Sequence, residues 1–286
     1  MAYGKALSDG GSFVKPVSGD RWRGVVERTW RPAALLATCL AIWHLITVSG
    51  LVEAYLVPSP SKTFQLLVDK WSYLWGHTWV TTYETILGFV IAGILGVLVA
   101  VAMVYSRTIE STAYPLLLFA QVIPKIAIAP LFVVWLGFGF EPKVVVAVLM
   151  AFFPVVISTV TGLKSVDTEM LELSATMGGG PIKTFVKIRF PAALPHLFAG
   201  LKVAVTLAVT GAVVGEFVGS NEGLGYVILQ ANGNMDTPML FAGLIVISVV
   251  GILLFLLLDL AEQLMLPWHS SRRGAAVTTL LAKGGT

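Results

Sequence analysis

The 286-residue sequence predicts an all-α polytopic membrane protein with about six transmembrane helices. Hydrophobic residues make up 56% of the chain and charged residues only 12%, and the mean hydropathy is +0.85. Soluble domains carry about 25% charged residues, and a water-soluble fold could not hide this much apolar surface. The apolar residues also gather into runs that are long enough to cross a hydrocarbon core about 30 Å thick as helices.

Six apolar runs carry this prediction, and each is expected to form one span. They lie near residues 33–51, 82–105, 114–137, 143–163, 197–217 and 240–265. The third and fourth runs are interrupted by Pro124, Pro130 and Pro154, where a kink or an unwound turn is expected. Gly88, Gly93 and Gly96 in the second run permit close helix packing.

The first 32 residues are polar and basic, and they are expected to form a cytoplasmic N-terminal tail. The first apolar run begins only at about Ala33, too far along the chain for a cleaved signal peptide, so it is expected to stay as a membrane anchor. Residues 33–266 then form the transmembrane domain, and residues 267–286 form a cytoplasmic C-terminal tail. After the first run, Pro58 and Pro60 are expected to end the helix, and Ser61 to cap a short one.

The distribution of Lys and Arg predicts which loops face the cytoplasm. With the N-terminus inside, fourteen of these residues fall in inner segments and three, Lys62, Lys70 and Lys143, in outer ones. The net charge is only +3, and no basic–aromatic stripe indicates a nucleic-acid partner. The chain is therefore expected in a membrane with both termini in the cytoplasm.

A polar, glycine-rich stretch from Glu172 to Pro195 lies between the fourth and fifth runs, within an inner loop at residues 164–196. A helix end is expected up to Met177, then a break at Gly178-Gly179-Gly180, then a helix opened by Pro181 and ended by Pro191. The second helix would present one apolar side to a groove on a partner; an ordinary amphipathic or re-entrant surface loop is the alternative. This apolar side comprises Ile182, Phe185, Val186 and Phe190.

The glycines in this stretch do not make a phosphate-binding loop. That pattern requires Gly directly before Lys, and Ile182 precedes Lys183. The sequence contains no other match to the pattern. ATP hydrolysis, if this chain uses it, is therefore expected in a separate chain.

The spacing of Glu172, Gly178, Ile188 and Phe190-Pro191 resembles the EAA signature of bacterial ABC importer permeases. Further stretches resemble the same family, and they are Pro58-Ser59-Pro60, Ile123–Gly139, Gly215–Ile228 and Pro267-Trp268-His269. Together they cover residues 33–269 and resemble the nitrate/sulfonate/taurine-type permeases of the type I importer fold. The chain departs from the family pattern at Phe190, where Leu is usual, and at Leu173-Ser174, where Ala-Ala is usual.

This resemblance implies a cytoplasmic coupling helix that docks onto an ABC ATPase. The residues implied to couple are Glu172, Ala175, Gly178, Gly179, Ile182, Phe185, Ile188 and Pro191. It also implies two copies of this chain forming the pore as a homodimer, two ATPase subunits that bind ATP and Mg, and a periplasmic or lipid-anchored substrate-binding protein. The chain itself would hold no cofactor, and its location would be the bacterial inner membrane.

The family branch leaves the solute open. A small anion such as a sulfonate, nitrate or carboxylate and a pyrimidine- or riboflavin-like nutrient are both expected candidates, the latter because the branch includes carriers of such compounds.

Charged residues inside the apolar runs are candidates for the substrate pathway. Lys125 follows Pro124 in the third run, and a lysine at mid-helix costs about 2.5–3.5 kcal/mol unless it faces protein or water. It either lines the pore or snorkels to an interface, or pairs structurally with Glu216 or Asp259. Glu216, in the fifth run, either lines an outer gate or caps the turn that follows. No His, Cys or carboxylate set has metal-ligand spacing.

Two other functions compete with the permease interpretation. An ion-gradient-driven secondary transporter predicts an internal repeat and carboxylates at mid-depth, whereas the sequence shows no repeat and few acidic residues within the spans. A membrane enzyme would need His, Asp or Cys side chains converging near one interface, and the four histidines are scattered.

Overall fold

The structure, a computed structural model, describes residues 20–50, 52, 53 and 55–267 and divides the chain into two compact units, residues 1–60 and 61–286. Most of the predicted tails, together with Trp268 and His269, lie outside the described residues. In the first unit, α1 runs from Asp20 to Val48, and the indole Nε1 of Trp43 donates a hydrogen bond to the Pro58 carbonyl at 3.0 Å. The first apolar helix therefore ends at Val48 rather than at residue 51, and its apolar part is Ala33–Val48.

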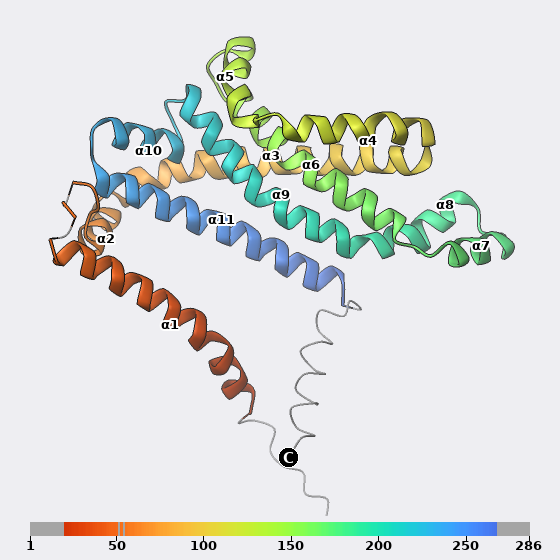
Figure 1. Cartoon of the computed structure of the whole chain (residues 1–286), viewed down its shortest axis with the longest axis horizontal. Coiled ribbons are helices and arrows are strands. Elements are labelled where there is room, and N and C mark those ends of the chain that lie inside the picture. Colours follow the sequence, from red (N-terminus) through yellow and green to blue (C-terminus); the bar gives the residue numbers. More distant parts are fainter. Residues whose placement is uncertain (1–19, 51, 54, 268–286) are drawn as a thin grey trace, which may run out of the picture. The chain divides into compact units, whose positions relative to one another are not determined.

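The remaining helices follow one another with short connections (Figure 1). Their bounds are α2 Pro60–Asp69, α3 Trp71–Tyr105, α4 Arg107–Val122, α5 Lys125–Leu136, α6 Glu141–Lys164, α7 Thr168–Thr176, α8 Pro181–Thr184, the π-helix η1 Phe185–Arg189, α9 Phe190–Gly219, α10 Leu224–Gly233 and α11 Thr237–Met265. No strand occurs among the described residues. Since α2 begins at Pro60, Ser61 lies inside the helix, and its predicted capping role is wrong.

The membrane class is confirmed, but the span count differs from the predicted six. Within the described residues, four helical segments are long and apolar enough to cross a membrane, and the bent pair α4–α5 would make a fifth. The four are α3, α6, the continuous run Pro181–Gly219 and α11. The second span begins at Trp71 instead of residue 82, and the fifth helical segment begins at Pro181 instead of residue 197.

The third predicted span, residues 114–137, is not one helix. α4 and α5 meet at an angle of 96°. Ile123 adopts an extended conformation (φ −67°, ψ 127°), as a residue before proline prefers, and Pro124 is the N-cap of α5. Pro124 therefore breaks the chain direction, whereas Pro130 and Pro154 are accommodated inside α5 and α6.

α6 forms the centre of the second unit. Its contact with α9 and its contact with α3 are each more extensive than the contact between any other two helices. Small residues allow this. A Cβ placed on Gly88 of α3 would lie 2.5 Å from Ala147 Cβ, and one on Gly211 of α9 would lie 2.6 Å from Ala147 Cα. Larger residues at either glycine would push the helices apart. Gly96 meets Val155 in the same way, but Gly93 does not, since its nearest neighbour atom is 3.8 Å away.

The contacts also fix the helix directions. α3 runs parallel to α6, since Gly88 and Gly96 meet Ala147 and Val155, and α9 runs antiparallel, since Gly211 and Gly200 meet Ala147 and Ser158. The starts of α3 and α6 therefore lie at the same end of the unit as the end of α9, and α7 and α8 lie at the opposite end (Figure 1).

α9 and α11 are joined by charged side chains. Lys202 Nζ pairs with Asp259 and, at 2.5 Å, with Glu262 Oε2. Both carboxylates of α11 therefore have as their partner a lysine within the neighbouring helix α9.

Candidate functional sites: coupling segment and buried ion-pair cluster

The first candidate site is the coupling segment, residues 168–190. Its first helix, α7, ends in a Schellman motif: Gly178 N–H donates to Ala175 O at 3.1 Å, and Gly179 N–H donates to Ser174 O at 2.8 Å. Gly178 has φ +76°, which glycine adopts without strain. The predicted break at the glycines and the predicted helix start at Pro181 are both confirmed, and Ser174 Oγ lies 2.9 Å from Thr184 Oγ1 across the turn.

The second half of the coupling segment does not end at Pro191. α8, η1 and α9 form one run from Pro181 to Gly219, and Pro191 lies in the first turn of α9. A proline inside a helix lacks an N–H and its ring clashes with the carbonyl four residues earlier. The π-helical turn at Phe185–Arg189, with its i→i+5 bonds, changes the register directly before Pro191, so the helix can continue.

The coupling segment exposes large apolar side chains at one end of the molecule. Ile182 is 80% exposed and Met177 is 79% exposed, and Met170, Leu173 and Val186 are exposed with them. Phe185 instead faces the helices: its ring centroid lies 5.8 Å from that of Tyr105, at the end of α3, and 5.8 Å from that of Phe190. The predicted apolar side is thus divided, with Ile182 and Val186 facing outward and Phe185 packed against α3.

The other residues implied to couple are distributed along the same segment. Glu172 and Ala175 lie exposed on α7, whereas Gly179 at its C-cap is half-buried. Ile188 in η1 and Pro191 in α9 are half-buried. The structure therefore brings the predicted coupling residues into one segment, of which α7 and the start of α8 are the outer part.

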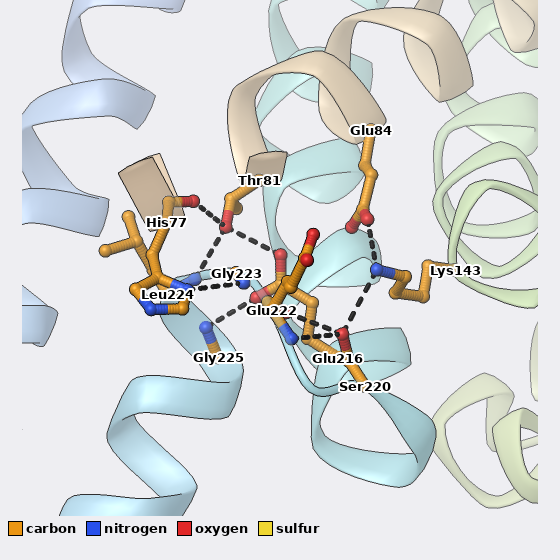
Figure 2. Close-up of polar contacts among 10 residues, drawn as sticks. All are labelled: His77, Thr81, Glu84, Lys143, Glu216, Ser220, Glu222, Gly223, Leu224 and Gly225. Atoms are coloured by element: carbon orange, nitrogen blue, oxygen red, sulfur yellow. Dashed lines mark hydrogen bonds and ion pairs between the residues drawn. The ribbon is translucent and has the colours of Figure 1, made fainter. Parts of the chain in front are cut away.

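The second candidate site is the buried ion-pair cluster, which comprises Thr81, Glu84, Lys143 and Glu216 (Figure 2). It lies at the end of the helices opposite α7 and α8. Glu84 of α3 and Lys143 of α6 form an ion pair in which both side chains are almost completely buried. Lys143 Nζ also donates to Ser220 Oγ at 3.1 Å, just after the end of α9. Lys143, counted above with the outer segments, lies in the first turn of α6 with 6% of its surface exposed.

Glu216 belongs to this cluster and holds the turn that begins α10. Its Oε1 accepts a hydrogen bond from Thr81 Oγ1 at 2.6 Å, and its Oε2 accepts one from the Gly225 N–H. Leu224 N–H donates to Thr81 Oγ1 at 2.8 Å, and Gly223 N–H donates to His77 Nδ1 at 3.0 Å. Glu216 was expected either to line an outer gate or to cap the turn that follows α9. These contacts are those of a capping residue, and the side chain is only 1% exposed.

Lys125 is separate from this cluster. At the start of α5, its Nζ donates to Gln121 O at 3.3 Å and lies 4.9 Å from the centroid of the Phe153 ring. Glu216 is held by Thr81 and Gly225, and Asp259 by Lys202. The alternative that pairs Lys125 with Glu216 or Asp259 is therefore wrong.

The sequence interpretation missed Glu84 and Lys143 as a site. One signal was available: Thr81, Glu84 and Thr85 recur at the helical spacing i, i+3, i+4 and place a polar stripe on an otherwise apolar helix. All three residues are fully buried. The identity of the partner, 59 positions along the chain at Lys143, could not be read from local spacing.

Residues 92–267, more than half of the chain, match the family described as "Binding-protein-dependent transport system inner membrane component". Three full-length relatives are similar to the chain. The formylaminopyrimidine transport permease protein ThiX of Halalkalibacterium halodurans is 36% identical, with 84% of this chain and 96% of the relative covered. The riboflavin transport system permease protein RibX of Chloroflexus aurantiacus is 35% identical (88% and 96% covered), and the taurine transport system permease protein TauC of Escherichia coli is 26% identical (87% and 94% covered).

Among solved structures, a chain of the inward-facing MetNI methionine ABC transporter superposes with a TM-score of 0.52. The superposition covers 65% of this chain and 95% of that chain, at 21% sequence identity. This likeness establishes the shared fold.

Proposed function

The chain belongs to the family of binding-protein-dependent transport system inner membrane components, as the permease subunit of an ABC importer, and from this premise we propose that residues 168–190 dock onto a separate ATPase subunit. The observation that carries the docking proposal is the exposed apolar surface of Met170, Leu173, Met177 and Ile182. Met170 and Leu173 lie on α7, Met177 at its C-cap and Ile182 in α8. The Schellman motif fixes the turn between the two helices, so that they can enter a groove on a partner as a rigid element.

The assembly that follows from this proposal is a symmetric one. Two copies of this chain form the pore as a homodimer, two ATPase subunits bind ATP and Mg beneath them, and a substrate-binding protein delivers solute from outside. The coupling segment then faces the cytoplasm, as do both termini, in agreement with the excess of Lys and Arg in those loops. ATP occupancy shifts the pore between inward- and outward-facing states, the two-state behaviour of alternating access.

Affinity purification from native membranes in mild detergent, with an ATP analogue present and mass spectrometry as the readout, tests the docking proposal. We expect an ATPase subunit in stoichiometric amount with the wild-type chain and its loss from an Ile182→Glu variant, because a charge would be buried in the contact. A homomeric wild-type protein without ATPase would favour an ion-gradient-driven transporter instead.

The solute is proposed from two kinds of observation. The relatives named above are a formylaminopyrimidine, a riboflavin and a taurine permease, so both a small anion (sulfonate, nitrate or carboxylate) and a pyrimidine- or riboflavin-like nutrient lie within the family's range.

We place Lys125 and Pro124 in the substrate pathway, because the break at Pro124 brings a half-buried ammonium group to the start of α5. Glu216 contributes to this pathway indirectly, because it holds the turn that begins α10 in place.

Replacing Lys125 with methionine is expected to raise the solute concentration for half-maximal uptake by about tenfold, the effect of losing one charged hydrogen bond to a solute anion or carbonyl. Uptake by the reconstituted importer measures this. Lys70→Met, at an exposed lysine before α3, serves as the matched control and is expected to leave uptake unchanged. Equal uptake by the two variants would assign Lys125 a structural role only.

A further inference from the structure

A pocket of about 400 Å³ opens beside the buried ion-pair cluster, at the end of the helices opposite the coupling segment. This volume lies in the range of small-molecule sites, about 300–1,000 Å³. Its walls come from α3, from the connection between α5 and α6, from α6 itself and from the loop between α9 and α10. The pocket is therefore formed by three stretches that are distant in the sequence, 79–84, 138–143 and 219–222, and it meets the loop that Glu216 and Thr81 hold in place.

Aromatic rings line one side of this pocket. Trp79 is 66% exposed, Tyr83 54% and Phe138 83%, and Phe140 lies beside them with its ring centroid 5.4 Å from that of Tyr83. Aromatic faces bind flat ring systems by stacking and bind cations through the ring quadrupole. Such a wall suits a flat ring system better than a small anion, because the negative ring faces attract cations and repel anions.

The charges around the pocket also disfavour an anion. Lys143 is the one cation among the lining residues, and it is already paired with Glu84 and hydrogen-bonded to Ser220. The Glu84 carboxylate is fully buried beneath the pocket, where it pairs with Lys143. Glu222 adds a second carboxylate at the exposed loop. The charges of Glu84 and Lys143 offset each other, so Glu222 gives the lining a net negative charge and an exposed acceptor for N–H donors.

We propose that this pocket recognises the transported solute, and that the solute is a flat, neutral or cationic heterocycle bearing N–H donors. The ring stacks on Trp79 and Tyr83, and the N–H groups face the exposed carboxylate of Glu222. This proposal rests on the importer function above and narrows its solute to one of the two candidate classes. It also gives the pocket a place in transport, as the first site that the solute meets on the permease.

Equilibrium binding to the full-length chain in lipid nanodiscs tests the pocket. The probes are riboflavin, followed by quenching of its fluorescence, and 4-aminopyrimidine, followed by saturation-transfer NMR, with taurine and nitrate as competitors. A Trp79→Leu variant is expected to weaken binding of both heterocycles by about tenfold, as loss of one aromatic stacking partner does. The matched control is Trp75→Leu, one turn earlier on α3 and 55% exposed, which lines a different, apolar groove and is expected to change the Kd less than twofold.

Three outcomes would overturn the proposal: competition by taurine or nitrate, absence of binding by both heterocycles, or equal Kd values for the Trp79 and Trp75 variants. A change in oligomeric state caused by Trp79→Leu alone, with heterocycle binding intact, would also overturn it by showing that these rings contact a second copy. The same preparation is tested for the ATPase subunit. Failure of heterocycle binding with the ATPase present overturns only the pocket, whereas absence of the ATPase overturns the docking proposal.

Discussion

A Lys143→Met variant is expected to be less stable than the wild type by roughly 3–5 kcal/mol, the cost of leaving one member of a buried ion pair without its partner. Lys143 and Glu84 are both buried between α3 and α6, so removal of the ammonium group leaves the Glu84 carboxylate buried without its cation. Thermal unfolding of the purified protein in one detergent, at one pH, measures the difference.

The chain supplies a matched control for this experiment. Lys164 lies at the other end of the same helix and also pairs with a glutamate, Glu110, but the two side chains are 43% and 34% exposed. Exposed pairs contribute about 0–1 kcal/mol, so Lys164→Met is expected to unfold close to the wild type. A Glu84→Gln/Lys143→Met double variant should recover part of the loss, since it removes the uncompensated charge. If Lys143→Met and Lys164→Met unfold alike, the ion pair is not a structural element of the fold.

The second large effect is expected at Gly178, where a valine should lower ATP-driven uptake by more than tenfold while the chain still inserts in the membrane. Gly178 has φ +76°, a conformation that costs L-residues roughly 1–2 kcal/mol and is least accessible to β-branched ones. The Schellman motif would then open, and α7 would lose its fixed angle to α8. Uptake and ATPase activity of the reconstituted importer, measured together, should show hydrolysis without transport.

Gly180→Val is the control for this variant. Gly180 has φ −70° and ψ 163°, which valine adopts readily and which suits a residue before proline, and no atom would contact the added Cβ within 4 Å. Normal uptake is expected. Coupled transport by Gly178→Val at the wild-type rate would show that the turn at Gly178 does not transmit movement from the ATPase.

The sequence predicts the helices best where an apolar run has polar ends. α6 and α11 begin and end within three residues of the predicted bounds, because charged residues or prolines flank both. The start of α3 was missed because residues 71–81 are rich in Trp, Tyr and Thr and form no apolar run. The angle between α4 and α5 was also missed, since Pro124 indicates a break but the packing partners decide its direction.

The coupling segment could be placed from local spacing, because a glycine turn, a proline start and an apolar stripe are all local features. The continuity of the helix through Pro191 could not, since it depends on a π-helical turn that has no sequence signature. The ion-pair cluster joins residues from α3, α6 and α9, and such contacts follow from the packing of Ala147 against Gly88 and Gly211 rather than from spacing along the chain.

The uninterrupted run from Pro181 to Gly219 has a mechanical consequence. Followed along the helix at 1.5 Å per residue, its 39 residues cover about 58 Å, and Gly211, which meets Ala147, lies about 12 Å from Gly219 and about 45 Å from Pro181. When the run rotates as one body about the contact between Gly211 and Ala147, a displacement of about 4 Å near Pro181 moves Gly219 by about 1 Å in the opposite direction. Hydrogen bonds such as those of Thr81, at 2.6 and 2.8 Å, do not survive a lengthening of about 1 Å. Under the docking proposed above, a large movement of the coupling segment would therefore reach the loop before α10 as a small one, and that small movement would suffice to break these hydrogen bonds.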